Sequence, residues 1–249
     1  MPNININNLT VKYIDKKTET IALDNISLSF EDKKISVIVG FSGSGKTTLL
    51  HTIAGLLGYP NQEIYGDIYF DDIDVTGLST KDRNISMVSQ SFSVYPHLTI
   101  YDNIAFPLKL YKWDRGKIDE AVKYIAKELD IYHCLSRKPK HISIGQAQRA
   151  SLARSLVKKP SVLLLDEPLS NLDEITKRTT RKLIKETVKK LGITLIYVTH
   201  NFEDALYLAD NIYVINDGKL EISGSPIDVY NSDSEIIKYM KESIKESEL

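Results

Sequence analysis

The sequence predicts an α/β fold with a mainly parallel core sheet, an antiparallel β part and a helical insert. Residues 35–39 and 162–165 are short apolar runs of the kind that form buried parallel strands, and polar residues follow each run. Residues 118–129 instead repeat their apolar side chains at the helical period. Buried strands interrupted by an amphipathic helical section indicate a layered α/β domain.

The segment 40–47 reads Gly-Phe-Ser-Gly-Ser-Gly-Lys-Thr and matches the phosphate-binding pattern G-x-x-x-x-G-K-[S/T]. Glycines let several backbone N–H groups approach a phosphate chain, while the lysine reaches the phosphates and the threonine reaches Mg²⁺. A surface turn is the alternative, but the apolar strand before the segment and the helix 48–57 after it favour a phosphate loop. The predicted phosphate-binding residues are Gly40, Phe41, Ser42, Gly43, Ser44, Gly45, Lys46, Thr47 and Thr48.

The composition limits the classes of function. The 249 residues carry 32 basic and 33 acidic side chains, and the net charge of −1 gives no electrostatic case for nucleic acid. The single cysteine, Cys134, excludes an internal disulfide and is expected to be a structural thiol in a reducing compartment. No apolar run approaches the roughly 20 residues that span a bilayer, so we expect a soluble protein or one attached to a membrane through a partner.

Further strands are predicted on both sides of the phosphate loop. Residues 3–30 contain alternating apolar segments around a polar turn at 15–20, and residues 64–70 form another segment of this type. A short strand ends at Gln90, and Tyr13 lies just before the polar turn. Taken alone, both side chains are ordinary strand residues.

The helical insert begins after these strands. Aromatic and proline residues cluster at 92–101, and the amphipathic helix 118–129 follows. A second helix is predicted to run from about 144 to about Val157, with Ser143 as its N-cap. Such a helix start either binds an anion or is simply capped, and the segment alone does not decide between these possibilities.

Two adjacent carboxylates, Asp166 and Glu167, follow the all-apolar strand 162–165. Open α/β sheets bind ligands at the carboxyl ends of their strands. In phosphate-loop hydrolases the first acid holds Mg²⁺, and the glutamate after it can activate water as a general base. Two acids in a surface turn are the weaker alternative, because a central buried strand leads directly into them.

A histidine follows the next predicted strand at the corresponding position. Residues 193–198 form this strand, His200 lies at its end, and Asn201 is expected to cap the helix 202–209. A lone histidine is more often structural than catalytic. At this end of a parallel strand, however, His200 is directed to the same sheet edge as the phosphate loop and Asp166.

The C-terminal part contains a hairpin and a helical tail. The sequence Asn-Asp-Gly at 216–218 indicates a tight turn between two short strands. From Ser234 onward, apolar residues repeat at helical spacing among charged ones. We expect an amphipathic helix that packs on the body of the protein or on a partner.

Taken together, these segments resemble the ATP-binding cassette (ABC) ATPase family over residues 3 to about 232. Residues 142–146, Ile-Ser-Ile-Gly-Gln, are similar to the family signature L-S-G-G-Q, and residues 170–173 to its dimer-contacting loop. The resemblance implies that Tyr13 stacks on adenine and that Gln90 touches the metal and senses a membrane partner.

The resemblance also assigns roles to the candidate site residues, with ATP and Mg²⁺ as the implied nucleotide and metal. The implied catalytic residues are Glu167, His200, Lys46 and Gln90. The implied metal ligands are Thr47, Gln90 and Asp166. The implied nucleotide contacts outside the phosphate loop are Tyr13, Ser143, Gly145 and Gln146.

The resemblance implies one domain, a P-loop NTPase of the ABC fold, over residues 1–249. Residues 1–90 and 155–225 are expected to form the core with the antiparallel β part. Residues 91–154 are expected to form a helical sub-domain that carries the signature, and residues 226–249 a helical tail.

Two segments, 93–99 and 167–173, look most like import ATPases of the maltose and multiple-sugar type. Ile144 stands where the signature usually has glycine, but Ser143 and Gly145 are kept, so activity is expected to survive. Sugar-type ATPases usually continue into a C-terminal β-rich regulatory domain. The sequence ends before such a domain, so regulation through it is expected to be absent.

The family mechanism implies that ATP closes two chains head-to-tail, with the signature of one chain completing the site of the other. Hydrolysis is then expected to drive a membrane permease that imports a sugar or another small solute. The implied partners are integral-membrane permease subunits and a second ATPase chain, identical or paralogous. An extracytoplasmic solute-binding protein is a further candidate, and no nucleic acid is expected. The implied location is peripheral, at the cytoplasmic face of the cell membrane.

A soluble ABC-fold ATPase acting on nucleic acid or ribosomes is the alternative function. The near-zero net charge and the lack of a long coiled coil or a second cassette disfavour it. A non-hydrolysing subunit would be expected to lack Lys46, Glu167 or His200, and all three are present. A switch GTPase would be expected to carry Asn-Lys-x-Asp, which the sequence lacks.

Overall fold

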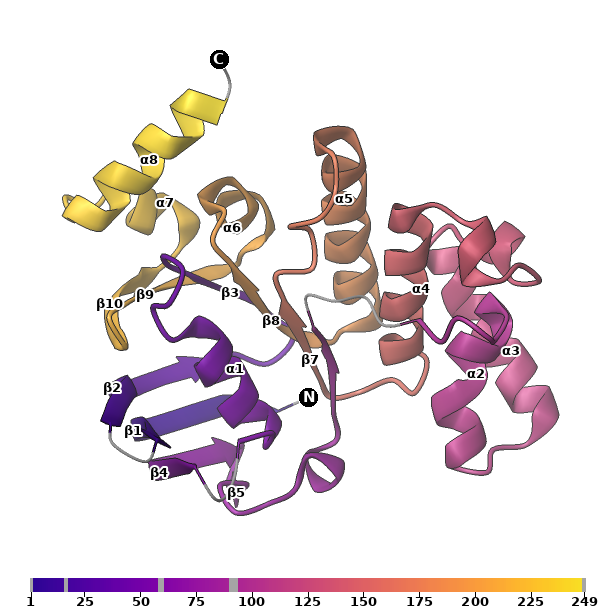
Figure 1. The fold of residues 1–249 in the computed structure, drawn as a ribbon, viewed down its shortest axis with the longest axis horizontal. Coiled ribbons are helices and arrows are strands. Elements are labelled where there is room, and N and C mark those ends of the chain that lie inside the picture. The colour runs from indigo at the N-terminus through magenta and orange to yellow at the C-terminus, as the bar shows by residue number, and fades with distance from the viewer. Residues whose placement is uncertain (1, 16–17, 58–60, 90–93, 248–249) are drawn as a thin grey trace.

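A six-stranded, mainly parallel sheet forms the centre of the protein (Figure 1), and it confirms the predicted α/β fold. The computed structural model describes residues 2–15, 18–57, 61–89 and 94–247. The strand order is β10-β9-β3-β8-β7-β6, and only β10 pairs antiparallel. The strands are β3 (Ile35–Val39), β6 (Ile85–Val88), β7 (Val162–Asp166), β8 (Thr194–Thr199), β9 (Asn211–Asn216) and β10 (Lys219–Gly224).

The second sheet is antiparallel and has the order β2-β1-β4-β5. Its strands are β1 (Ile4–Asp15), β2 (Thr18–Phe30), β4 (Gln62–Phe70) and β5 (Ile73–Asp74). Helix α1 (Lys46–Ala54) buries Leu49, Leu50 and Ile53 in the apolar cluster that this sheet shares with one face of the core sheet. Helix α1 ends at Ala54 because Gly55 adopts a left-handed φ of 66°, so the predicted helix 48–57 was too long.

The polar turn predicted at 15–20 is wrong in its extent. Strand β1 continues to Asp15 and β2 begins at Thr18, with Ile14 opposite Glu19 in the ladder. Backbone pairing therefore continues where the side chains are exposed, and an ion pair of 2.6 Å joins Lys12 and Glu19 across the strands. A cross-strand pair of this kind favours strand structure in a segment whose composition suggests a turn.

Three helices form the insert: α2 (Ile100–Leu110), α3 (Arg115–Glu128) and α4 (Ile144–Leu156). Helix α3 confirms the predicted amphipathic helix. Helix α2 was not predicted, although Thr99 caps it and Ile100, Ile104 and Leu108 form its buried face. Pro107 within it obscures the helical pattern in the sequence. Short 3-10 helices cover Thr80–Arg83, Tyr132–Cys134 and Pro139–His141.

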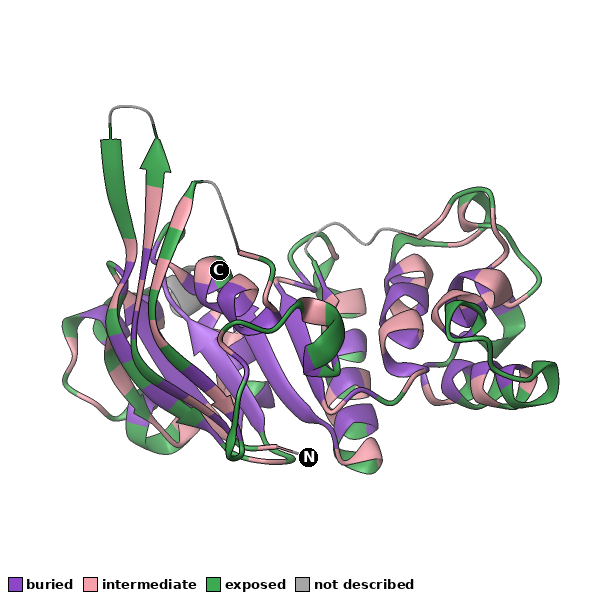
Figure 2. Ribbon diagram, turned by 90° about the horizontal axis from the view of Figure 1, so that it is seen from below, coloured by how far each residue is buried: buried purple, intermediate pink, exposed green. Residues whose placement is uncertain are grey.

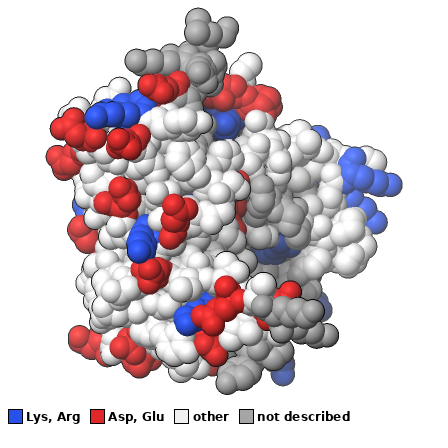
Figure 3. All heavy atoms as spheres, turned by 60° about the vertical axis from the view of Figure 1, so that its left-hand side comes forward, with Lys and Arg blue, Asp and Glu red and all other residues white. Residues whose placement is uncertain are grey.

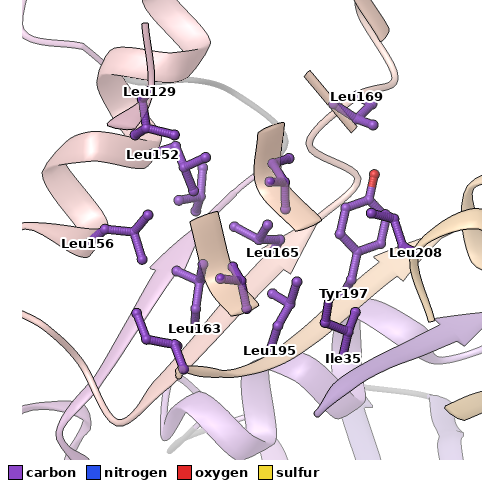
Figure 4. Close-up of a cluster of buried hydrophobic side chains, with 14 of the residues drawn as sticks. Ile35, Leu129, Leu152, Leu156, Leu163, Leu165, Leu169, Leu195, Tyr197 and Leu208 are labelled. Carbon is purple, nitrogen blue, oxygen red and sulfur yellow. The ribbon is translucent and has the colours of Figure 1, made fainter. Parts of the chain in front are cut away.

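The remaining helices are α5 (Glu174–Leu191), α6 (Phe202–Leu208), α7 (Pro226–Tyr230) and α8 (Glu235–Ser247). Buried residues concentrate in the core strands and on the inner faces of the helices (Figure 2). Figure 4 shows one face of the core sheet, where strand side chains meet helix side chains. The labelled cluster is Ile35, Leu129, Leu152, Leu156, Leu163, Leu165, Leu169, Leu195, Tyr197 and Leu208.

Cys134 is fully buried in the same cluster, and burial raises the pKa of its thiol. A protonated, inaccessible thiol is a poor nucleophile. The surroundings of Cys134 are therefore those of a structural residue. No helix in the described ranges is long and apolar enough to cross a membrane.

Candidate functional site

The predicted phosphate loop lies between β3 and α1, and two of its glycines are required by the packing. A Cβ at Gly45 would lie 2.5 Å from the Ala22 carbonyl oxygen, and the φ of Gly45 is 103°. A Cβ at Gly40 would lie 2.1 Å from the Ile215 carbonyl oxygen. Only glycine fits such approaches, so the loop is held between the backbones of β2 and β9.

The turn of the β9–β10 hairpin braces the same loop. The Gly218 N–H donates to the Ser44 carbonyl over 3.0 Å, and the Gly218 carbonyl accepts from the Asp24 N–H over 2.8 Å. The sequence predicted the hairpin but not this contact, because the two segments are far apart along the chain. The loop is therefore anchored on its inner side before any ligand binds.

Lys46 is only 5% exposed, and its ammonium donates to the Phe41 carbonyl over 2.7 Å. Burial lowers the pKa of Lys46, while the nearby Glu167 and Asp166 carboxylates raise it. A buried cation of this kind is stabilised by any anion that replaces its backbone partner. Lys46 is thus placed to exchange a loop carbonyl for a phosphate oxygen.

Asp166, at the end of β7, faces Thr47 at the start of α1. The Thr47 hydroxyl donates to Asp166 Oδ1 over 3.2 Å. Burial raises the pKa of Asp166, although the Thr47 hydrogen bond lowers it. A hydroxyl and a buried carboxylate that face each other are the hard oxygen donors that Mg²⁺ prefers, so these residues fit the implied metal.

Glu167 and His200 meet at the ends of β7 and β8. Glu167 Oε1 lies 3.1 Å from His200 Nδ1, and the Glu167 N–H donates to the Val198 carbonyl over 2.9 Å. Glu167 has a φ of 45°, a left-handed conformation that is uncommon for a residue other than glycine. This backbone conformation fixes the direction in which the carboxylate leaves the strand end.

A cavity of about 330 Å³ brings these groups together. It is lined by Ala22, Ser42, Gly43, Gly45, Lys46, Thr47, Thr48, Asp166 and Glu167. Ala22 was missed in the sequence, since a small strand residue gives no signal of its own. Tyr13 lies beside this lining, and its hydroxyl shares a hydrogen bond of 3.3 Å with Thr48 Oγ1.

The signature residues are not part of this lining. Ser143 and Gln146 form a capping box at the start of α4, with hydrogen bonds of 3.2 Å and 3.0 Å between them. Ile144 beside them is 66% exposed. Gly145 packs against α5, where a Cβ would lie 2.8 Å from Thr176 Cγ2. Gln90, the remaining predicted site residue, lies outside the described residues.

A contact that the sequence did not indicate links α4 to the acidic segment. Gln148 of α4 donates its side-chain amide to the Pro168 carbonyl, directly after Glu167. The Ser170 hydroxyl donates to the Glu167 carbonyl over 3.0 Å, and Asp173 caps α5. The segment that carries Glu167 is therefore tied to the helix that carries the signature.

A phosphate loop, two acids at a strand end and a histidine at the next strand end define a nucleotide-binding site of the phosphate-loop class. The sequence profile of the ABC transporter family matches residues 23–170, and the chain belongs to this family. The fold and the ordered motifs agree with that assignment.

Two similar relatives carry the names of import ATP-binding proteins. The chain is 44% identical over 219 residues to the trehalose/maltose import ATP-binding protein of Thermococcus litoralis, covering 86% of this chain and 58% of the relative. It is 43% identical over 227 residues to the glucose import ATP-binding protein of Saccharolobus solfataricus, covering 89% and 63%. The chain thus spans about three fifths of the length of these relatives.

A solved structure is also similar. The ATP-binding cassette MJ0796, in a dimeric post-hydrolysis state bound to ADP and phosphate, superimposes with a TM-score of 0.77 at 27% identity. The match covers 90% of this chain and 98% of that chain. The predicted family and fold are therefore confirmed.

Proposed function

We propose that this chain is the ATP-hydrolysing subunit of a membrane transporter that imports a sugar or another small solute. The observation that carries the proposal is the cavity around the phosphate loop. Lys46, Thr47, Asp166 and Glu167 all line it, and His200 reaches Glu167 from the neighbouring strand. These are the groups that phosphoryl transfer from ATP to water requires.

In this proposal the phosphate loop binds the ATP triphosphate through its backbone N–H groups and the start of α1. Lys46 leaves the Phe41 carbonyl and contacts the phosphates. Tyr13 lies at the Thr48 end of the lining, in support of its proposed contact with adenine. Thr47, Asp166 and Gln90 are the proposed ligands of Mg²⁺, which supplies positive charge beside the phosphates.

Glu167 is the proposed general base. Its carboxylate takes a proton from a water molecule as the water oxygen bonds to the γ-phosphorus and the bond to the ADP oxygen breaks. The products are ADP and inorganic phosphate. His200 holds the Glu167 carboxylate through its Nδ1. Its other ring nitrogen is the proposed contact to the γ-phosphate.

A second chain is needed to complete this site. Ser143 and Gly145 do not line the cavity of their own chain, and they belong to α4 of the helical insert, whereas the phosphate loop belongs to the core. We infer that the signature of one chain faces the phosphate loop of the other in a head-to-tail dimer. ATP then binds the closed state preferentially, and this difference in affinity shifts the open–closed equilibrium.

The proposed membrane partner contacts the groove between α2, α4 and β6. This groove has a volume of about 610 Å³, and its lining mixes apolar, aromatic and cationic side chains, a composition found in protein interfaces. Its members include Tyr95, Phe106, Leu110, Tyr111 and Arg154. The import names of the relatives support permease subunits as the partners, with a peripheral location at the cytoplasmic face of the membrane. An extracytoplasmic solute-binding protein would complete the system.

Capture of the tagged chain from detergent-solubilised native membranes tests the transport assignment. Mass spectrometry is expected to identify polytopic membrane proteins, and a co-purifying solute-binding protein would indicate the substrate. On the face shown in Figure 3, acidic and basic side chains are interspersed, which does not favour a nucleic-acid surface. If only ribosomal or nucleoprotein partners were captured, the transport function would have to be abandoned.

A further inference from the structure

The C-terminal helix α8 is docked on the body of the protein by one apolar face. Ile236, Ile237 and Met240 are buried in the main core cluster. The helix packs against α6, which begins directly after His200 and Asn201. Helix α8 is therefore packed against the helix that directly follows His200 in the chain.

Another side chain of α8 reaches the phosphate loop itself. The ring of Tyr239 meets the ring of Phe41 in an edge-to-face contact, with 5.3 Å between the centroids and 78° between the planes. Tyr239 is 61% exposed and Phe41 is 40% exposed, so the pair lies on the surface. The docking of α8 does not depend on this pair, because the buried face of the helix provides it.

The Phe41 carbonyl is a centre of hydrogen bonding within the phosphate loop. Its carbonyl accepts hydrogen bonds from the Lys46 ammonium over 2.7 Å and from the Ser44 N–H over 3.2 Å. Ser42 and Gly43 beyond it are exposed, and a Cβ at Gly43 would meet no atom within 4 Å. The inner side of the loop is braced by β2 and β9, whereas the outer side is held through Phe41.

We propose that Tyr239 is a positioning residue for the phosphate loop, acting through the Phe41 ring. This inference rests on the proposed function and extends it to the C-terminal helix. By fixing Phe41, Tyr239 keeps the loop in the conformation that receives phosphate, so less ordering is required when ATP binds. Tyr239 does not line the cavity, so its effect is expected on ATP affinity rather than on the chemical step.

The test compares variants of the full chain by ATP affinity and turnover. Tyr239→Ala and Tyr239→Leu are expected to weaken ATP binding by about two- to tenfold, the effect of an edge-to-face ring pair. Tyr239→Phe keeps the ring and is expected to bind like the wild type. At saturating ATP, kcat is expected to be unchanged, so KM rises while kcat does not.

Tyr230→Ala is the matched control. The Tyr230 side chain is 43% exposed. The Lys241 Nζ of α8 lies over its ring, 4.3 Å from the ring centroid, and this contact does not involve the phosphate loop. This control is expected to leave ATP affinity unchanged. In a Phe41→Ala background, Tyr239→Ala is expected to have no further effect, because the two residues act through one contact.

The outcomes separate this inference from the proposed function. If the wild-type chain neither binds nor hydrolyses ATP, both are overturned. If the wild type binds ATP but Tyr239→Ala behaves like Tyr230→Ala, only the role of Tyr239 is overturned. An unchanged or increased affinity in Tyr239→Leu, or additive losses with Phe41→Ala, would also reject it.

Discussion

Replacing Glu167 with glutamine removes the proposed general base and keeps its shape. Glutamine retains an oxygen that can accept a hydrogen bond from His200 Nδ1. Both side chains must adopt the same left-handed backbone conformation at this position. The cavity lining includes one other carboxylate, Asp166, which is already engaged by Thr47. With no equivalent base in place, kcat is expected to fall by roughly 100- to 10,000-fold. This loss corresponds to about 3 to 5 kcal/mol of activation free energy.

Phosphate release at saturating Mg²⁺ and ATP measures this effect on the purified chain. ATP binding is expected to persist, and the closed dimer is expected to accumulate. Glu186→Gln is the control, since Glu186 is an exposed residue of α5 with only a 3.9 Å surface contact to Lys182. If the turnover of Glu167→Gln stayed within about threefold of the wild type, Glu167 could not be the base.

Two further predictions concern stability. Burial raises the pKa of Asp166 above its unfolded value, so protonation favours the folded state and this contribution is lost as pH rises through the folded pKa. In thermal unfolding without nucleotide, Asp166→Asn is therefore expected to be more stable than the wild type at neutral pH, and the difference in stability is expected to shrink in acid. A wild type more stable than Asp166→Asn at neutral pH would contradict the burial argument. Arg181 is buried and lies 2.9 Å from Glu203 and 3.2 Å from buried Asp204, so Arg181→Met should cost about 3 to 5 kcal/mol in denaturant unfolding. Arg178→Met, which removes an exposed ion pair with Glu174, is its control. Equal losses of unfolding free energy in the two variants would show that the buried ion pairs contribute no more stability than the exposed one.

The parts of the fold that could be predicted are those with a local pattern. The phosphate loop, the strand before Asp166 and the strand before His200 all lie where the sequence indicated, because buried parallel strands are short and continuously apolar. The side chains at their carboxyl ends necessarily meet at one sheet edge. The shared location of these side chains therefore follows from the parallel arrangement of the strands, whereas the direction of the Glu167 carboxylate also depends on its left-handed backbone conformation.

The contacts that were missed all join segments far apart in the chain. The bonds from Gly218 to the phosphate loop and from Gln148 to Pro168 depend on tertiary packing, for which no local pattern exists. The contact between Tyr239 and Phe41 spans almost the whole sequence. The sequence analysis did not single out Arg181 of α5, because its burial depends on its contact with Asp204 of α6.

Hydrolysis by a mixture of two inactive variants tests the central claim most directly. Lys46→Ala disables the phosphate loop, and Ser143→Arg disables the signature. In a head-to-tail dimer, the mixed pair has one intact site, formed by the phosphate loop of the Ser143 variant and the signature of the Lys46 variant. Random pairing makes half of the dimers mixed with one of two sites intact, so activity should recover toward about a quarter of the wild-type value. A mixture that stays as inactive as either variant alone would contradict a site shared between two chains.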